Sequence, residues 1–275
     1  MSNAVKDTAS KAKGFEPNPD ITEEELAAMR VEVQDRVITA RVGLLLRHPF
    51  FGNMATRLKI QSCDDWCPTA ATDGRNLYYN TQFFNAMNNK EIEFVIAHEI
   101  LHCVYDHLGR REDRVPQLYN IAADYCVNNT LVRERIGEIP KLVDCFQDFK
   151  YDGWTSEEVY EELFDKAKED LEEFLEEMEQ MGNLLDDHVD WEDGDGEDSD
   201  LESNGEGNSS GKPRYSKEEM KKIRDEIKEN MISAAQAAGA GNVPGDVQRM
   251  IKELTEPKMN WREIIRQQIQ STVKN

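Results

Sequence analysis

One stretch of the sequence, residues 91–108, restricts the fold more than any other, because it combines an apolar run with the pattern His98-Glu-Ile-Leu-His102. Residues four apart lie on one face of an α-helix, so a helix here would bring the two imidazoles together. Glu99 would lie about 100° further round the same helix. Two imidazoles that can share an ion, with a carboxylate beside them, are the arrangement of a zinc hydrolase site. We therefore expect His98 and His102 to bind a metal ion.

The neighbours of this motif decide between a buried metal site and a solvent-facing row of polar side chains. The run carries, among other apolar residues, Phe94, Val95, Ile96, Ala97, Ile100, Leu101 and Val104. A helix of this composition is expected to be largely buried. Burying two imidazoles and a carboxylate without a partner would be costly, which favours a metal site. The alternative is an amphipathic helix whose His98, Glu99 and His102 simply face water.

The composition indicates a chain with a folded part and a separate, strongly polar part. The chain has 275 residues, of which 39% are hydrophobic and 32% charged, enough for one good-sized domain with appendages. The sequence shows no 18-residue apolar run and no secretory signal at its N-terminus, so we expect no membrane span. Five irregularly spaced cysteines indicate reduced thiols, and we expect a cytoplasmic location (the host cytoplasm if the gene is carried by a phage). Cys63-x-x-x-Cys67 could be half of a second metal site, but no matching cysteine pair follows.

Most of the net charge of −22 lies in one segment. Residues 157–206 contain 23 aspartates and glutamates against two lysines, so the rest of the chain is near neutral. Such a segment is not expected to bind nucleic acid directly. It could cover a cleft, bind a basic protein partner or act as a solvated spacer, and the spacer is the interpretation that composition favours.

Hydrophobic periodicity predicts an α+β fold, mainly helical, with a small sheet near the motif helix. The expected helices span residues 22–47, 81–88, 91–108, 118–132, 156–181, 217–238, 246–254 and 261–269, and the expected strands span residues 55–62 and 69–79. Phe50-Phe51-Gly52 is predicted to form a turn. The expected organisation is a flexible tail at 1–20, a core at 21–165, an acidic and largely disordered insert at 166–215, and C-terminal helices at 216–275 that pack on the core.

A zinc site of this kind usually takes a third protein ligand. His107 is the nearest candidate, but on an unbroken helix it would lie about 900° from His98 and so on the opposite side. Asp124 is the better candidate, because it falls in the next predicted helix among apolar residues, where a lone carboxylate would be costly. Alternatively, Asp124 caps a helix N-terminus or forms an ion pair. Asn128 shares its helix face.

Several motifs in order resemble the bacterial and phage family described as a putative metallopeptidase domain, which usually precedes a von Willebrand factor A-like domain. The motif at 98–102, the segments His107-Leu-Gly-Arg-Arg and Tyr119-Asn-Ile-Ala-Ala-Asp124, and the segment Gly241-Asn-Val-Pro-Gly245 carry the resemblance, with further matches at 68–80, 153–160 and 260–262. The resemblance covers about residues 25–165 and 216–270. It implies a zincin-like fold, with His98, His102 and Asp124 as zinc ligands and Glu99 as general base. The chain ends at Asn275, where family members typically continue into the A-like domain.

These observations lead to one expected function and one alternative. The expected function is zinc-dependent hydrolysis of a protein or peptide, with Glu99 taking a proton from water. Tyr125, Tyr160 and His107 are candidate transition-state donors. The small sheet would suit this activity if an extended peptide added to a free strand edge. The alternative is a non-catalytic adaptor, or an acidic mimic of nucleic acid, with a structural metal site, although such a site would need no base at Glu99.

Overall fold

The computed structural model describes residues 14–168, 170–182 and 213–255. Its elements, in chain order, are α1 (Glu23–Arg47), α2 (Pro49–Arg57), β1 (Lys59–Ser62), β2 (Ala70–Thr72), β3 (Asn76–Tyr79), α3 (Thr81–Ala86), α4 (Asn89–Val104), α5 (His107–Arg110), α6 (Pro116–Glu134), α7 (Ser156–Lys166), α8 (Leu171–Met181), α9 (Lys217–Ala238) and α10 (Gly245–Thr255), with a 3₁₀ turn at Phe149–Tyr151. The fold is α+β and mainly helical, as the sequence predicts.

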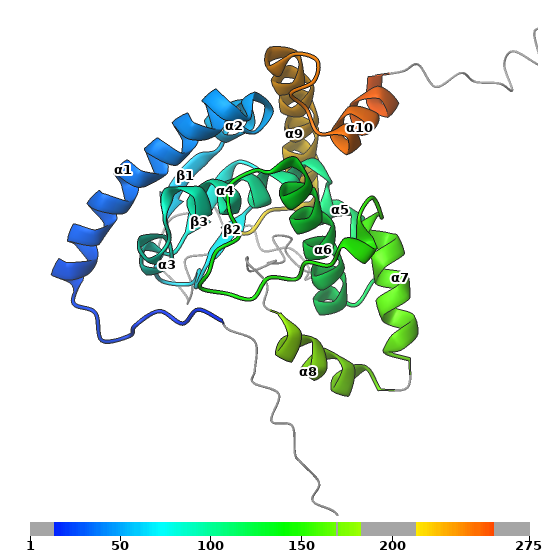
Figure 1. Ribbon diagram of the computed structural model, residues 1–275, viewed down its shortest axis with the longest axis horizontal. Helices are drawn as coiled ribbons and strands as arrows, with labels where there is room; N and C mark the ends of the chain where they lie inside the picture. Colours follow the sequence, from blue (N-terminus) through cyan, green and yellow to red (C-terminus); the bar gives the residue numbers. More distant parts are fainter. Residues whose placement is uncertain (1–13, 169, 183–212, 256–275) are drawn as a thin grey trace, which may run out of the picture.

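Helix α4, which carries the motif, lies at the centre of the fold, and its residues from Glu91 to Val104 are all buried. It begins at Asn88, whose side chain accepts hydrogen bonds from the backbone N–H groups of Lys90 and Glu91, while the Glu91 carboxylate accepts from the Asn88 N–H. Such a capping box satisfies backbone donors that the first helical turn leaves free. Helices α1, α2, α6 and α9 pack around α4, so its polar side chains face protein on every side (Figure 1).

The three strands form a small sheet in the order β1-β3-β2, with β1 parallel and β2 antiparallel to β3. The single strand predicted at 69–79 is therefore a hairpin. Its turn is held by Asp73, whose carboxylate accepts hydrogen bonds from the N–H groups of Arg75 and Asn76, and Gly74 adopts φ 91. Strand β2 contacts α4, which places the sheet beside the motif helix.

The turn predicted at Phe50-Phe51-Gly52 is wrong, because these residues lie in α2. Pro49 occupies the first turn of this helix, where its missing N–H costs nothing. Both phenylalanines are buried in the core. Gly52 allows α2 to lie against α1, since a Cβ atom there would come within 2.2 Å of the Leu45 Cα. Apolar burial and close packing thus outweigh the turn signal.

Two further helix boundaries differ from the prediction. The helix expected at 156–181 is two helices, α7 and α8, and the motif helix ends at Val104 rather than near residue 108. Most of the insert expected at 166–215, and the whole of the helix expected at 261–269, lie outside the described residues. Among the helices that the structure describes, none has the length and apolar character needed to cross a lipid bilayer.

Candidate metal centre

Helices α4 and α6 bring His98, His102 and Asp124 together in the interior. The two imidazole Nε2 atoms lie 3.0 Å apart. Asp124 Oδ1 lies 3.6 Å from His98 Nε2 and 3.4 Å from His102 Nε2. All three side chains are at most 2% exposed. Within residues 14–168, 170–182 and 213–255 this is the one cluster of three or more such groups close enough to hold an ion, and Cys63 and Cys67 do not form a second.

The separations of these three atoms fit a small divalent ion. Zinc bonds of 2.0–2.1 Å put neighbouring ligand atoms of a tetrahedron about 3.3 Å apart. The observed separations of 3.0, 3.4 and 3.6 Å lie on either side of that value. Two imidazoles and one carboxylate are also a ligand set typical of catalytic zinc, which keeps its fourth position for water. The residues present therefore fit a zinc ion.

Asn128 fixes the orientation of the His98 ring. Its Oδ1 lies 2.9 Å from His98 Nδ1, while its Nδ2 donates to the backbone carbonyl of Phe146 at 2.9 Å. Because Asn128 Oδ1 can only accept, His98 Nδ1 must carry the proton, which leaves a lone pair on Nε2. That lone pair faces the Asp124 carboxylate. A partner of this kind on the far nitrogen is the usual support of a metal-binding histidine.

The prediction that His107 points away from the site is wrong. It assumed an unbroken helix, but α4 ends at Val104 and Asp106 adopts the left-handed conformation with φ 58 and ψ 36. The short helix α5 then brings His107 Nδ1 to 2.9 Å from His102 Nδ1. This contact is on the side of the His102 ring away from Asp124, so His107 supports a candidate ligand and is not itself one of the clustered donors.

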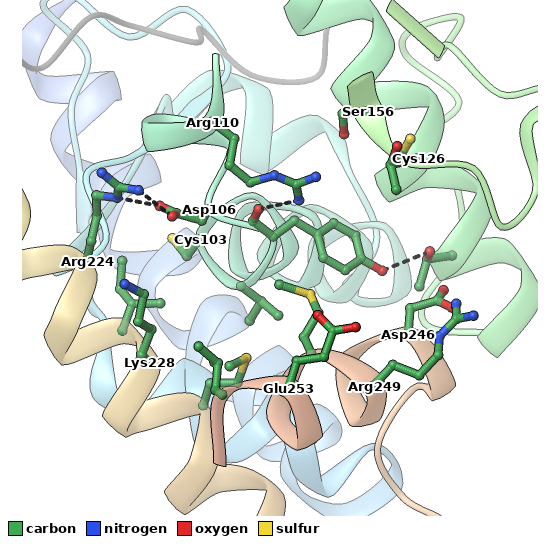
Figure 2. Close-up of a pocket in the computed structure, with 18 of the residues that line it drawn as sticks. Cys103, Asp106, Arg110, Cys126, Ser156, Arg224, Lys228, Asp246, Arg249 and Glu253 are labelled. Atoms are coloured by element: carbon green, nitrogen blue, oxygen red, sulfur yellow. Dashed lines mark hydrogen bonds and ion pairs between the residues drawn. The ribbon is translucent and has the colours of Figure 1, made fainter. Parts of the chain in front are cut away.

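An ion pair from α9 holds the chain at this break (Figure 2). Arg224 donates to both carboxylate oxygens of Asp106, from Nε at 2.6 Å and from Nη2 at 2.5 Å. Gly109 leaves room for this approach, because a Cβ atom there would lie 1.9 Å from the Arg224 guanidinium carbon. Because α9 lies more than 100 residues after α4, the local sequence around His107 does not predict the contact that holds this break.

The hydrogen bonds continue from His107 to Ser156, the first residue of α7. Ser156 Oγ lies 2.7 Å from His107 Nε2. If His102 Nε2 presents a lone pair, its Nδ1 donates to His107 Nδ1, and His107 Nε2 then donates to Ser156 Oγ. Ser156 also lines a cavity of about 1270 Å³ between α4, α7, α9 and α10, where Figure 2 shows it beside Cys126. From the sequence, Ser156 was expected only to begin the helix at 156–181 and to lie in a segment that resembles the family.

Glu99 lies on a face of α4 next to that of the two histidines. Its side chain is fully buried. One turn further on this face, Cys103 Sγ lies 3.4 Å from Thr72 Oγ1 of β2, so the Glu99 face is the one turned toward the sheet. Burial raises the pKa of the Cys103 thiol, and the Glu99 charge adds to that shift. Glu99 is therefore on the face of α4 that is turned toward β2.

The cluster is closed to solvent in this conformation, since His98, Glu99 and Asp124 are each 0% exposed. The segment at 143–146 lies against the cluster. The Phe146 backbone carbonyl accepts a hydrogen bond from the Asn128 side chain. Burial raises the pKa of the Cys145 thiol, and the nearby charge of Asp124 raises it further. Phe146 in turn packs in one cluster with Met178 of α8. A substrate could reach the cluster only after these segments move. The three residues of β2 are also buried, so the free strand edge expected from the sequence stays a prediction.

The cysteines near this site are buried and weakly acidic. Burial raises the pKa of Cys103 and of Cys126 to about 12, so both thiols stay protonated near neutral pH.

The tyrosines suggested as transition-state donors have other contacts: the Tyr125 ring packs against Phe146 and Tyr151, and the Tyr160 hydroxyl accepts from the Val115 N–H. The side chains left to act at this site are the histidines and the carboxylates of the cluster and Glu99.

Comparison with known proteins finds one matching family. The model of a family described as "Putative metallopeptidase domain" matches residues 32–275. That range includes every residue of the cluster, its supports Asn128, His107 and Ser156, and helix α9. Searches of curated proteins and of solved structures find no match.

Proposed function

We propose that this chain, which belongs to the putative metallopeptidase domain family, is a zinc-dependent peptidase that cleaves a protein or peptide with Glu99 as general base. The family implies a metal ion and a polypeptide substrate, and the buried group of His98, His102 and Asp124 offers a site for that ion. The observation that carries the proposal is the separation of these donor atoms, which matches the edges of a zinc tetrahedron.

Each residue has a separate role in the proposed reaction. His98 Nε2, His102 Nε2 and Asp124 Oδ1 would hold the ion, while Asn128 and His107 orient the two rings. When bound, zinc supplies Lewis acidity, which makes water more acidic and polarises the scissile carbonyl. Glu99 would take the proton of the attacking water on its carboxylate and pass it to the nitrogen of the leaving amine. The dry surroundings of this carboxylate strengthen its electrostatic interactions with charge that develops nearby.

We also infer that the fold is of the zincin type, because the motif helix lies beside a small sheet and receives its third donor from a following helix. The competing function is a non-catalytic protein in which the metal is structural. The complete burial of the cluster favours that alternative, since a catalytic zinc keeps a position open to substrate. The intact Glu99 favours the peptidase, because a structural site needs no base.

Removal of the metal separates these two functions. We expect 1,10-phenanthroline to abolish cleavage of a fluorescently labelled, unfolded protein, and one equivalent of zinc to restore it, because water loses its activating ion. Magnesium should not restore cleavage, since it prefers an all-oxygen site. The isomer 1,7-phenanthroline, which cannot chelate, is the control. Cleavage that continues in protein shown to be metal-free would refute the proposal. Zinc that only raises the melting temperature, with no cleavage at any concentration, would support the structural alternative.

Loss of the Asn128 side chain should weaken metal binding without removing a ligand. We expect Asn128→Ala to raise the dissociation constant for zinc by about 10- to 100-fold, because the His98 ring loses the acceptor that sets its tautomer. Competition with a chromogenic chelator measures this constant. Asn129→Ala is the matched control, since Asn129 is also buried and its amide bonds to the Asp148 carbonyl and the Gln147 side chain of the same loop. Equal losses of affinity in both variants would show a general loosening of the loop instead.

A further inference from the structure

Helix α1 has apolar residues on two faces, and only one of them packs on the core. The inner face is formed by Leu26, Val33, Val37, Ala40 and Leu44. The other face is exposed: Val31 is 66%, Ile38 51%, Val42 49% and Leu45 40% exposed. Figure 1 shows α1 along the outer edge of the molecule, with α2 and α3 on its inner side. A row of exposed apolar side chains on one helix is the kind of surface that contacts another protein.

The exposed residues follow the spacing of a coiled-coil seam. Starting at Ala28, the positions 28, 31, 35, 38, 42 and 45 alternate in steps of three and four, and Asp35 is the one polar residue among them. This alternation is the a and d pattern by which two helices pack along each other. The seam runs over most of the 25 residues of α1, a helix about 37 Å long. Its partner is therefore expected to be another helix.

The charges of α1 indicate which helix that is. Residues 23–35 contain five carboxylates and one arginine, whereas residues 36–47 contain three arginines and no carboxylate. Arg36 and Arg41 donate to the backbone carbonyls of Asn85 and Ala55, which are neutral, so these interactions leave the positive charge available. A second copy of α1 running in the opposite direction would place its basic half, which begins at Arg36, against Glu32 and Asp35, while Glu23, Glu24 and Glu25 lie beyond the overlap of the two helices. A parallel copy would oppose like charges.

We propose that this chain forms a symmetric dimer through antiparallel packing of α1 against α1 of a second copy. The two-fold axis lies near Ile38, so that Val31 of one copy faces the turn between Val42 and Leu45 of the other. Asp35 then lies within one turn of Arg41 of the other copy. Such an interface is isologous, because the same surface is used by both subunits. A single helix pair is smaller than a standard interface of about 800 Å² per partner, so we expect dissociation constants in the micromolar range.

Sedimentation equilibrium of the full chain at concentrations from about 1 to 200 μM tests the dimer. We expect reversible dimerisation, and a dissociation constant raised at least about 30-fold by Ile38→Glu, because the substitution brings two carboxylates to the axis. Phe149→Glu is the matched control, since Phe149 is 58% exposed outside α1 and should not affect association. A wild-type chain that stays monomeric over this range would overturn the proposal, as would a dimer that Ile38→Glu leaves unchanged.

The direction of packing needs a separate experiment. Val31→Cys and Val42→Cys variants are mixed and treated with a short bismaleimide. The antiparallel arrangement predicts that the cross-linked product contains one chain of each variant, whereas a parallel dimer would link Val31→Cys chains to each other. The wild type under the same conditions shows any reaction of its own five cysteines. Homotypic products, or vesicle binding by a monomeric chain that Ile38→Glu abolishes, would exclude the proposed interface.

Discussion

Replacing Glu99 with glutamine is expected to lower kcat for cleavage of an unfolded protein by about 100- to 10,000-fold while the bound zinc stays at one ion per chain. Glutamine has nearly the same shape but cannot take a proton from water. Glu99 is not one of the clustered donors, so metal binding should survive. Zinc content by atomic emission and kcat are measured on the same preparation.

A second buried glutamate of the same helix provides the control for this substitution. Glu91 belongs to the capping box at the start of α4 and is 4% exposed, and glutamine keeps the capping-box hydrogen bond to Asn88. It loses the second oxygen, which accepts from the Lys141 N–H, so we expect a lower melting temperature but no effect on the metal or the base. Glu91→Gln should therefore keep both zinc and kcat. If Glu99→Gln retained full activity, Glu99 would not be the base and the proposed mechanism would fail. If it lost zinc together with activity, Glu99 would belong to the metal site instead.

The central helix and its partners could be predicted from the sequence because local signals and burial agree there. The run from Phe94 to Val104 is apolar with helical spacing, and the α1, α6 and α9 patterns each end at clear caps or breakers. The failures occurred where distant contacts outweigh local signals. Pro49 to Gly52 has the composition of a turn, yet the two phenylalanines enter the core and the glycine lies against Leu45. Only the tertiary packing explains that outcome.

The same distinction holds at the candidate metal centre. His98, Glu99 and His102 follow from a five-residue pattern. Asp124 follows from its place among apolar residues of the next predicted helix, and Asn128 from sharing its helix face. His107 could not be placed, because its position depends on a left-handed residue at 106 that is paired to Arg224 of α9. A sequence pattern gives the periodicity of a helix but not the contact that ends it. For this reason the contact of His107 with His102 could not be predicted, whereas Asn128, which contacts His98, could be placed on the face of Asp124.

Asp124→Ala is expected to abolish stoichiometric zinc binding, with the dissociation constant raised by about 1000-fold, because the site loses one of its three proposed ligands and the only carboxylate among them. Zinc should then no longer raise the melting temperature, since a ligand that binds the native state stabilises it only when its concentration exceeds the dissociation constant. The apoprotein of this variant should still fold, because the substitution removes a buried carboxylate rather than an apolar contact. Differential scanning calorimetry with and without zinc separates loss of metal from loss of fold.

His107→Ala distinguishes a ligand from a residue that supports one. His107 Nδ1 contacts His102 Nδ1, on the side of the ring away from Asp124, so its loss should weaken zinc binding by about 10- to 100-fold and leave one ion per chain at saturating zinc. The contrast between about 1000-fold and at most 100-fold decides the identity of the third ligand. If His107→Ala lost zinc completely while Asp124→Ala kept it, the third ligand would be His107, and the helix break at Asp106 would exist to bring that imidazole to the ion rather than to orient His102.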